Sequence, residues 1–367
     1  MDCKKHPVSE SPAHGGDIIS AACFAGLAAE KILDFSSSIN PLGPPPGLYD
    51  FLAENLPVIT RYPDPLARQL CAAIEAHYRP YADFVPGNGA AELIFLLLRA
   101  LSPRTVLLPA PTFSLYERAA MSVGSRIIFH RLTAENSFHL DYSRFCAAVR
   151  ERRPELVFLC NPNNPTGELL EREQLLAIAK EVNAVGGLLA VDEAFLEFRE
   201  DYRRRTLLSS SGPGNVVVLC SLTKMFAVPG LRLGFMAGPP QVINAVRAAR
   251  DPWSVNALAQ LAGEYVLAQK GFTEKSAAAV SALGKDLAQA LSGLPWLTTA
   301  LPTVNYLFLE SRTLTSAELQ RRLLASGILV RDCSNFRGLD SQHVRVAVRT
   351  AAENERLLEA LREQNRT

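Results

Sequence analysis

The distribution of hydrophobic residues divides the chain into two regions that predict different elements. Between about residues 49 and 250, short apolar, β-branched runs alternate with longer amphipathic segments. This alternation is typical of a mostly parallel sheet covered by helices on both faces, an α/β fold. We predict strands at Thr105–Leu108, Arg126–His130, Leu156–Cys160, Gly187–Val191 and Val216–Cys220. We predict the helices between them at Ala90–Leu101, Phe113–Val123, Arg144–Arg152 and Arg172–Val185.

After Pro252 the pattern changes to long helical stretches and then to mixed strands and helices. We predict helices at Ser254–Gln269, Glu274–Leu291, Ala317–Ala325 and Glu353–Arg362, and strands at Val304–Leu309, Ile328–Arg331 and Val344–Val348. The Pro- and Gly-rich segment Asn40–Gly47 separates an N-terminal arm from the first region. We therefore predict a large domain at residues 46–254, and a smaller α+β domain formed by residues 1–45 and 255–367.

Composition narrows the class of protein. The formal net charge is +1 and 48% of the residues are hydrophobic, which gives no electrostatic reason to expect nucleic acid or an acidic membrane as partner. No apolar run approaches the ~20 residues of a membrane span. The run Ile18–Ala29 resembles a signal peptide faintly, but Asp17 suits the N-cap of an amphipathic helix better. The seven scattered cysteines favour reduced thiols in a cytoplasmic protein over a disulfide framework, and no metal site is predicted.

The segment around Lys224 carries the most informative chemistry. The predicted strand Val216–Cys220 ends just before it, so Lys224 lies where open α/β sheets place their functional groups. A lysine amine can form a Schiff base with an aldehyde, while the hydroxyls of Ser221 and Thr223 and the guanidinium of Arg232 can hold a phosphate. Taken alone, the lysine also fits a solvated loop residue.

Three further motifs follow predicted strands or open helices. Gly87–Glu92 leads from a loop into an apolar helix, whose start is suited to a phosphate, although an ordinary glycine turn is an alternative. The two prolines of Asn161–Gly167 fix a loop that presents asparagine amides. Asp192 follows the buried strand Gly187–Val191, where a carboxylate needs a partner. A protonated pyridine nitrogen would be one, and a helix cap is the alternative role.

The order and spacing of four motifs resemble those of pyridoxal-phosphate enzymes of the aspartate-aminotransferase fold, also called fold type I. The motifs are Asn161–Gly167, Asp192–Phe195, Ser221–Lys224 and Leu231–Gly234. The resemblance covers nearly the whole chain. It implies pyridoxal 5'-phosphate as cofactor and a mostly parallel central sheet with a smaller α+β domain.

The resemblance also implies roles for individual residues. Lys224 would carry the cofactor and act as the catalytic residue, Asp192 would pair with the ring nitrogen, and Asn164 would bond the ring's 3′-oxygen. Phe113 would stack on the ring. The cofactor phosphate would be held by Gly89, Ala90, Ser221, Thr223 and Arg232. Tyr62 would reach the phosphate of a neighbouring subunit, which implies a homodimer with shared active sites.

Two branches of this family act on phosphorylated substrates: the decarboxylases of threonine phosphate in cobalamin synthesis and the aminotransferases of histidinol phosphate. Phe195 stands where the aminotransferases usually have a tyrosine. The segments that resemble the decarboxylases are His14–Ile18, Ser38–Gly43, Pro252–Leu258 and Arg331–Phe336. The expected reaction is therefore the decarboxylation of L-threonine O-3-phosphate to (R)-1-amino-2-propanol O-2-phosphate, with histidinol-phosphate transamination as the alternative.

The substrate-binding residues are less sharply defined. The resemblance implies that Arg345 holds the substrate carboxylate, and Arg331 is the first candidate for the substrate phosphate. Asn40, His14 and Arg349 are further candidates. A salt bridge at Arg331, a capping role for His14 and an ion pair at Arg349 remain open. A regulatory protein of the same fold is a non-catalytic alternative, but the first 45 residues are too short and too weakly basic for the DNA-binding module it would need.

Overall fold

The computed structural model describes residues 15–209 and 214–364, whose strands form a seven-stranded, a four-stranded and a two-stranded sheet. The larger sheet has seven strands in the order β2-β8-β7-β6-β5-β3-β4. Only β8 runs antiparallel to its neighbours, so the predicted, mostly parallel sheet is confirmed. Its strands are β2 (Asp83–Gly87), β3 (Thr105–Ala110), β4 (Arg126–Arg131), β5 (Leu156–Cys160), β6 (Leu188–Asp192), β7 (Val216–Ser221) and β8 (Gly234–Gly238).

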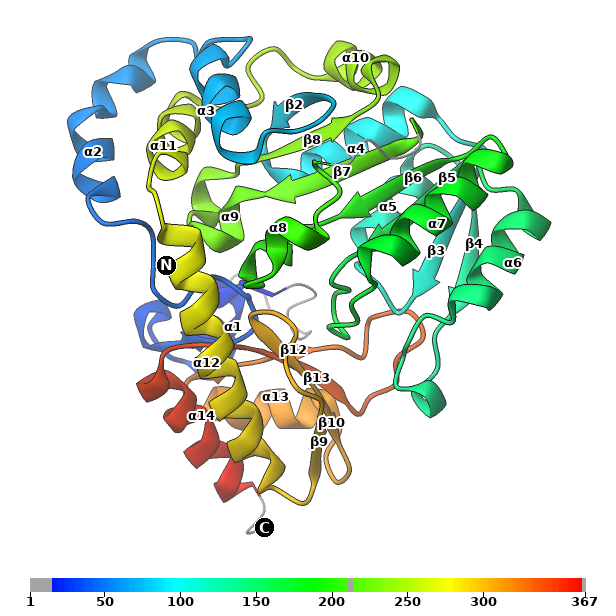
Figure 1. The fold of residues 1–367 in the computed structure, drawn as a ribbon. Helices are drawn as coiled ribbons and strands as arrows, with labels where there is room; N and C mark the ends of the chain where they lie inside the picture. Colours follow the sequence, from blue (N-terminus) through cyan, green and yellow to red (C-terminus); the bar gives the residue numbers. More distant parts are fainter. Residues whose placement is uncertain (1–14, 210–213, 365–367) are drawn as a thin grey trace.

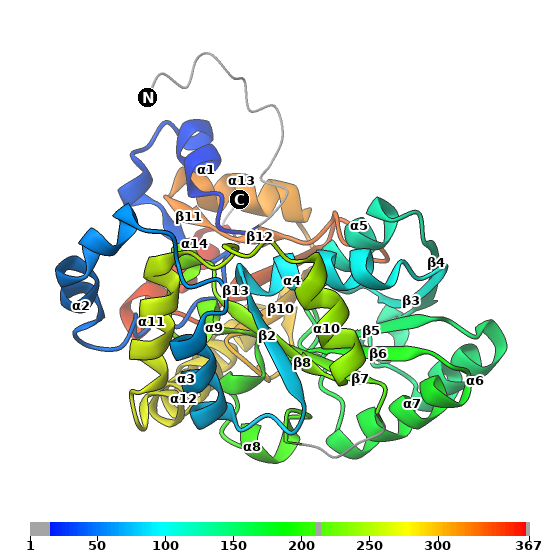
Figure 2. The same cartoon turned by 90° about the horizontal axis from the view of Figure 1, so that it is seen from above.

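Helices cover both faces of the large sheet, with α6 and α7 on one face and α4, α5 and α10 on the other (Figures 1 and 2). The helices of this part are α2 (Leu48–Glu54), α3 (Arg68–Tyr78), α4 (Gly89–Leu101), α5 (Leu115–Ser122), α6 (Tyr142–Arg152), α7 (Arg172–Ala184), α8 (Tyr202–Arg205), α9 (Leu222–Met225) and α10 (Pro240–Ala249). Successive residues of β5 belong to different hydrophobic clusters: Val157 joins the cluster that contains Ile178 of α7, and Phe158 joins that of Leu93 in α4. Burial on both faces explains why the strand sequences read as continuous apolar runs.

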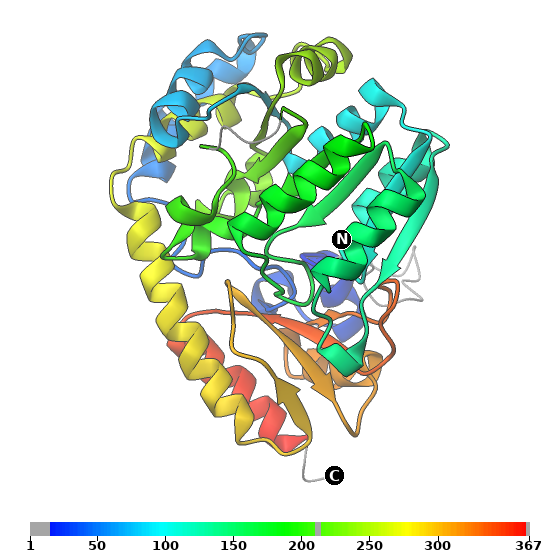
Figure 3. The same ribbon diagram turned by 45° about the vertical axis from the view of Figure 1, so that its right-hand side comes forward.

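The smaller sheet is antiparallel, with strand order β12-β13-β10-β9, and lies apart from the large sheet in Figure 3. Its strands are β9 (Leu297–Thr299), β10 (Tyr306–Ser311), β12 (Arg331–Asp332) and β13 (His343–Ala347), and its helices are α13 (Ser316–Ala325) and α14 (Ala351–Glu363). The long helix α12 (Phe272–Ser292) runs from the large part to the small part (Figure 1). The predicted small α+β region is therefore present.

The N-terminal arm packs with the small part, as predicted. Strand β1 (Leu33–Asp34) pairs in parallel with β11 (Ile328–Leu329). Helix α1 (Ile18–Ala25) begins after Asp17, whose carboxylate accepts a hydrogen bond from the Ser20 amide at 3.0 Å. The N-cap expected at Asp17 is confirmed, because this bond satisfies one of the free amides at the helix start.

The differences from the predicted elements are local. The single predicted strand Ile328–Arg331 is two strands, because Leu329 pairs with β1 while Arg331 pairs with β13. Strands β2, β8 and β9 were not predicted. The domain limits at residues 46–254, 1–45 and 255–367 stay a prediction. Helix α11 (Ala257–Leu267) packs against α3 of the large part.

Three expectations from composition can be compared with the described residues. Among them no helix is long and apolar enough to cross a membrane, and no group of metal-binding side chains occurs. Five cysteines are free thiols: Cys71, Cys146, Cys160, Cys220 and Cys333. Cys23 is disulfide-bonded, so the expectation of reduced thiols is wrong at this position.

Candidate active site

A cavity of about 550 Å³ lies between the carboxyl ends of the large sheet's strands and the small sheet. Ten residues predicted from the sequence line it: Ala90, Phe113, Asn164, Asp192, Ser221, Thr223, Lys224, Arg232, Arg331 and Arg345. They come from several loops that are distant in sequence. The cavity brings them together because parallel strands deliver their carboxyl ends to one edge of the sheet.

Asp192 is the last residue of β6 and is buried in the cavity wall. Its carboxylate accepts a hydrogen bond from the hydroxyl of Tyr116 at 2.7 Å and from the amide of Ala194 at 2.9 Å. Burial raises the pKa of Asp192, while the bond from Tyr116 opposes that rise. The carboxylate is therefore held in place by two donors and has room for a cationic partner in the cavity.

Lys224 lies in the short helix α9, directly after β7. Its Nζ donates to Thr223 Oγ1 at 3.1 Å, and that oxygen lies 2.7 Å from Ser221 Oγ. Burial, and then the nearby charge of Arg232, lower the pKa of Lys224 from 10.5 to about 8. The ε-amine is thus partly neutral near physiological pH, the form in which an amine attacks an aldehyde.

Glycines allow Arg232 to reach the start of α4. A Cβ on Gly89 would lie 2.6 Å from the Arg232 NH2 atom, and φ at Gly89 is +78°, a value that favours glycine. A Cβ on Gly234 would lie 2.9 Å from the amide nitrogen of Ala90. Arg232, two hydroxyls and a helix start therefore meet at one end of the cavity, a donor set suited to a dianionic phosphate.

The asparagines of Asn161–Gly167 have separate roles. Asn161 bonds the backbone of Leu170 in both directions, and Asn163 accepts from the Thr112 hydroxyl at 2.8 Å, so both fix the loop. Asn164 instead lines the cavity, and its Oδ1 accepts from Arg345 NH1 at 2.5 Å. Because Oδ1 is engaged, the amide nitrogen of Asn164 is the group left to donate to a ligand.

Arg331 and Arg345 occupy directly opposite positions of the paired strands β12 and β13. Both are buried, at 4% and 6% exposure. Arg345 donates to Asn164 and to the Ser36 carbonyl at 2.7 Å, and its Nε has no partner. Arg331 donates to the Asp332 carbonyl and to Asn335 Oδ1. Neither guanidinium forms an ion pair with a carboxylate among residues 15–209 and 214–364, so both charges are available to a ligand.

Three predicted residues have other positions in the described chain, and a fourth lies outside it. Tyr62 is 81% exposed and packs on the Trp253 ring, 4.8 Å away between centroids. Arg349 pairs with Glu353 at 2.6 Å, the ion-pair alternative left open above. Gly89 supports the cavity wall without lining it. His14 lies outside the described residues.

Asn40 does not line the cavity, and its role in substrate binding stays a prediction. Its side-chain amide donates to the Met225 carbonyl at 2.8 Å and to Ser276 Oγ at 2.9 Å, and its backbone amide donates to the Lys224 carbonyl at 3.0 Å. Asn40 therefore fixes the backbone on which the lysine stands.

The sequence analysis missed one polar cluster in the wall, formed by Asp34, Ser36 and Ser37. Asp34 Oδ1 accepts from the Ser36 amide at 2.8 Å and from the Ser36 hydroxyl at 2.5 Å. Ser36 Oγ in turn accepts from the Gly16 amide at 2.8 Å. An acid followed by two serines is a turn signature, and this signal was available in the sequence.

Comparison with known proteins assigns the fold. The family described as "Aminotransferase class I and II" matches residues 30–361. The chain belongs to this family. The match spans both sheets, so the resemblance stated above is confirmed for the fold.

Three relatives show the range within the class I and II aminotransferase family. The chain is 40% identical to "Threonine-phosphate decarboxylase" of Salmonella typhimurium over 95% of this chain and 96% of that protein. It is similar to the structure of the histidinol-phosphate aminotransferase from Clostridium acetobutylicum (TM-score 0.84, 28% identity, 90% and 98% coverage). It is also similar to L-threonine-O-3-phosphate decarboxylase from Porphyromonas gingivalis (TM-score 0.78, 26% identity, 91% and 99% coverage).

The protein is a pyridoxal-phosphate-dependent enzyme, and its residues fit the cofactor. The buried carboxylate of Asp192 needs a cation, which a protonated pyridine nitrogen supplies. The lowered pKa of Lys224 suits an amine that binds an aldehyde. The hydroxyls of Ser221 and Thr223 lie with Arg232 where the phosphate would be held.

Proposed function

We propose that this enzyme decarboxylates L-threonine O-3-phosphate to (R)-1-amino-2-propanol O-2-phosphate, as part of cobalamin biosynthesis. One observation carries the proposal: the cavity contains two buried guanidiniums, Arg331 and Arg345, on opposite positions of adjacent strands and without carboxylate partners. Like charges opposite each other destabilise a sheet, and a substrate with two anionic groups removes that cost. The relative from Salmonella typhimurium supports the same choice.

The cofactor, when bound, withdraws electrons from the substrate's α-carbon. The protein's own part is positioning and proton transfer. Asp192, held by Tyr116 and Ala194, supplies a fixed negative charge to the ring nitrogen. Lys224, with its pKa near 8, could donate the proton that takes the place of the lost carboxylate on the α-carbon.

The two arginines orient the substrate. We assign the phosphate to Arg331 and the carboxylate to Arg345. Charge-assisted bonds contribute about 1.5–3 kcal/mol each, enough for two of them to fix the orientation of the substrate's α-carbon. A guanidinium that only stabilised the bound carboxylate would slow its loss. We therefore infer that Arg345, one nitrogen of which is held by Asn164, would act mainly by fixing the direction in which the substrate carboxylate is held.

Phe195 supports decarboxylation over transamination, because the aminotransferases usually have a tyrosine at this position. It lines the cavity, with Lys224 Nζ 5.9 Å from its ring centroid, and offers no hydroxyl to the ring's 3′-oxygen. Asn164 is then the donor to that oxygen. Transamination of histidinol phosphate is the second candidate, favoured by the similarity to the aminotransferase from Clostridium acetobutylicum.

We further propose a cytoplasmic homodimer in which Tyr62 enters the partner's site. Large apolar side chains are exposed on α2, on the 3-10 turn Leu56–Thr60 and on the loops around it: Tyr49, Leu56, Ile59, Tyr62, Leu66 and Trp253. Large exposed apolar side chains are typical of interaction surfaces when they gather on one face, and Tyr62 and Trp253 are in contact. Sedimentation of the holoenzyme tests the dimer, and a monomer at micromolar concentration would contradict it.

An assay with two substrates tests the reaction. The holoenzyme is given O-phosphothreonine, and carbon dioxide is measured; a parallel sample receives histidinol phosphate with 2-oxoglutarate, and glutamate is measured. We expect carbon dioxide in the first sample and little glutamate in the second. Formation of glutamate without carbon dioxide would contradict the proposed decarboxylase and support the aminotransferase.

A further inference from the structure

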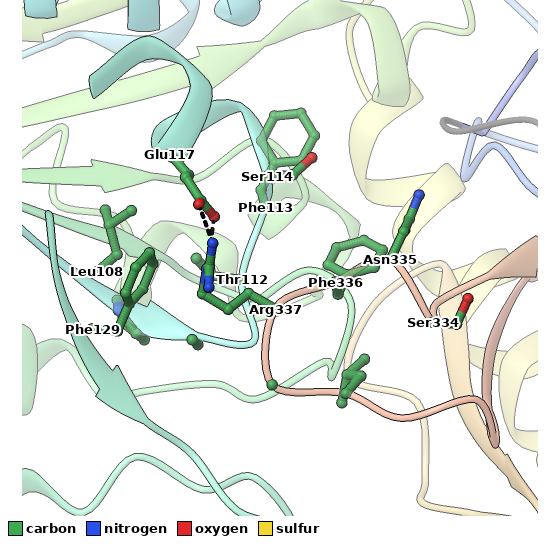
Figure 4. A pocket seen from close by; sticks show the side chains of 14 residues that line it. Leu108, Thr112, Phe113, Ser114, Glu117, Phe129, Ser334, Asn335, Phe336 and Arg337 are labelled. Atoms are coloured by element: carbon green, nitrogen blue, oxygen red, sulfur yellow. Dashed lines mark hydrogen bonds and ion pairs between the residues drawn. The ribbon is translucent and has the colours of Figure 1, made fainter. Parts of the chain in front are cut away.

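An ion pair connects the loop after β12 to the large part of the molecule. Arg337 Nε donates to Glu117 Oε2 at 3.0 Å, and Arg337 NH2 donates to Glu117 Oε1 at 2.5 Å. Glu117 belongs to α5, and Figure 4 shows the two side chains meeting head-on. The Arg337 guanidinium also lies over the Phe129 ring, 4.4 Å from its centroid. The bidentate geometry fixes direction as well as distance.

The same loop holds Arg331 on its other side. Asn335 Oδ1 accepts from Arg331 NH2 at 2.7 Å, and the Arg331 guanidinium lies 4.9 Å from the centroid of the Phe336 ring. Three consecutive residues therefore link Arg331 to α5: Asn335 and Phe336 contact Arg331, and Arg337 contacts Glu117. A shift of the loop relative to α5 must move the two side chains that orient Arg331.

Packing holds part of this loop, because Phe336 is 4% exposed and Leu339 packs against the main hydrophobic cluster. A cavity of about 540 Å³ separates much of Ser334–Leu339 from α5 and β4, and Phe113 and Phe336 line both this cavity and the active-site cavity. The loop also comes close to β3 at Gly338, where a Cβ would lie 3.2 Å from the Ala110 carbonyl oxygen. The side chains of Arg337 and Glu117 are 55% and 23% exposed, so their pair adds little to global stability. Its effect falls on the position of the loop.

We propose that Glu117 and Arg337 are positioning residues that set the geometry of Arg331 for the phosphate of the substrate. The inference rests on the proposed function, because it takes the phosphate-binding role of Arg331 from there. Neither residue touches the reacting atoms. They determine how well the enzyme distinguishes a phosphorylated amino acid from its unphosphorylated counterpart.

The test compares Glu117→Gln, Arg337→Met and the exchanged pair Glu117→Arg/Arg337→Glu with the unchanged holoenzyme. We expect each single variant to raise KM for O-phosphothreonine about tenfold, part of the loss for a whole charge-assisted bond, with kcat changed much less. The dissociation constant of inorganic phosphate, measured by calorimetry, should rise in parallel. KM for threonine should stay within about twofold, and the exchanged pair should recover part of the phosphate affinity.

Glu318→Gln is the matched control, because Glu318 pairs with Arg321 and Arg322 on α13 and does not line the active-site cavity. It should leave all four quantities unchanged. Equal KM increases for phosphorylated and unphosphorylated substrates, or unchanged phosphate affinity in both single variants, would overturn the inference. If the parent enzyme released no carbon dioxide but bound phosphate, the proposed function would be refuted instead. The phosphate titrations of the variants would still test whether the ion pair positions Arg331.

Discussion

The two walls of the active-site cavity are built differently. On the cofactor wall, Asp192 and Lys224 stand at the ends of β6 and β7, in the middle of a seven-stranded sheet. On the substrate wall, Arg331 belongs to a strand of two residues, and its side-chain partners come from a loop. With the roles proposed above, the comparison teaches that the cofactor chemistry would be fixed by the sheet, whereas the choice of substrate would depend on short segments.

The largest effect is expected from Lys224→Ala on the cofactor wall. Removal of the amine should lower decarboxylation by roughly 10²–10⁴-fold or more, the contribution of a positioned acid–base group. The fold should remain, because the one side-chain bond of Lys224 goes to its neighbour Thr223. Carbon dioxide release measures the activity and circular dichroism measures the fold. Lys180→Ala, at an exposed lysine, is the control. Activity within tenfold of the parent would contradict the assignment.

Asp192→Asn keeps the shape and removes the charge. Loss of the charge opposite the ring nitrogen should lower activity about ten- to a thousandfold, from pKa shifts of roughly 1–3 units. In the cofactor-free protein the raised pKa of Asp192 disfavours its ionised form, so stability falls as pH rises past the ordinary range of an aspartate. The variant should escape that loss. Denaturant unfolding of the cofactor-free parent and variant at neutral pH measures the difference. If the Asp192→Asn variant were clearly less stable than the parent, burial of the Asp192 charge would not be destabilising.

Arg331→Met should act on the substrate wall alone. We expect KM for O-phosphothreonine to rise about ten- to a hundredfold, as for one charge-assisted bond, with the cofactor spectrum unchanged. Arg349→Met is the control, because Arg349 pairs with Glu353 and does not line the cavity. A larger rise in KM for Arg349→Met than for Arg331→Met would assign phosphate binding to Arg349 instead.

The pH dependence of cofactor capture separates the walls further. With its pKa near 8, Lys224 is protonated below that pH and neutral above it. The rate at which cofactor-free protein binds pyridoxal phosphate covalently should therefore rise with pH, with a midpoint near 8 rather than 10.5. Absorbance of the bound cofactor follows the rate. A midpoint above pH 10 would show that burial and Arg232 do not perturb the amine.

The smallest effect on the reaction is expected at Asn40. Asn40→Ala removes the bonds to Met225 and Ser276 and should lower the free energy of unfolding by about 1–3 kcal/mol. KM for O-phosphothreonine should hardly change. Asn55→Ala, whose amide bonds the Phe51 carbonyl at 2.8 Å, is the control for the loss of a side-chain–backbone bond. A raised KM with unchanged stability would instead support a substrate-binding role for Asn40.

The sequence predicted the cofactor wall well for a physical reason. Buried parallel strands leave a strong apolar signal, and a polar residue directly after such a strand has few structural explanations. Asp192 ends a strand of this kind, Asn164 and Lys224 come shortly after two others, and all three line the cavity. Strand β8 was missed because Gly234–Gly238 is short and contains two glycines, which weaken a strand signal.

The substrate wall was harder to predict, because its contacts join distant segments. Asn40 looked like a ligand-binding residue but bonds the backbone beside Lys224, a contact across 185 positions at Met225. The ion pair of Glu117 with Arg337 spans 220 positions. Charged residues in helices and loops are usually solvated, so sequence alone gives no reason to join these two.

The register between β12 and β13 places a strict condition on any redesign. Side chains alternate between the faces of a strand, so one residue inserted at Val330 would turn the guanidinium of Arg331 to the opposite face. The amino acid would be retained while its function was lost. A search for enzymes of the same specificity must therefore compare strand alignment as well as residue identity, and an engineered change of substrate has to preserve the count of residues between Leu329 and Asp332.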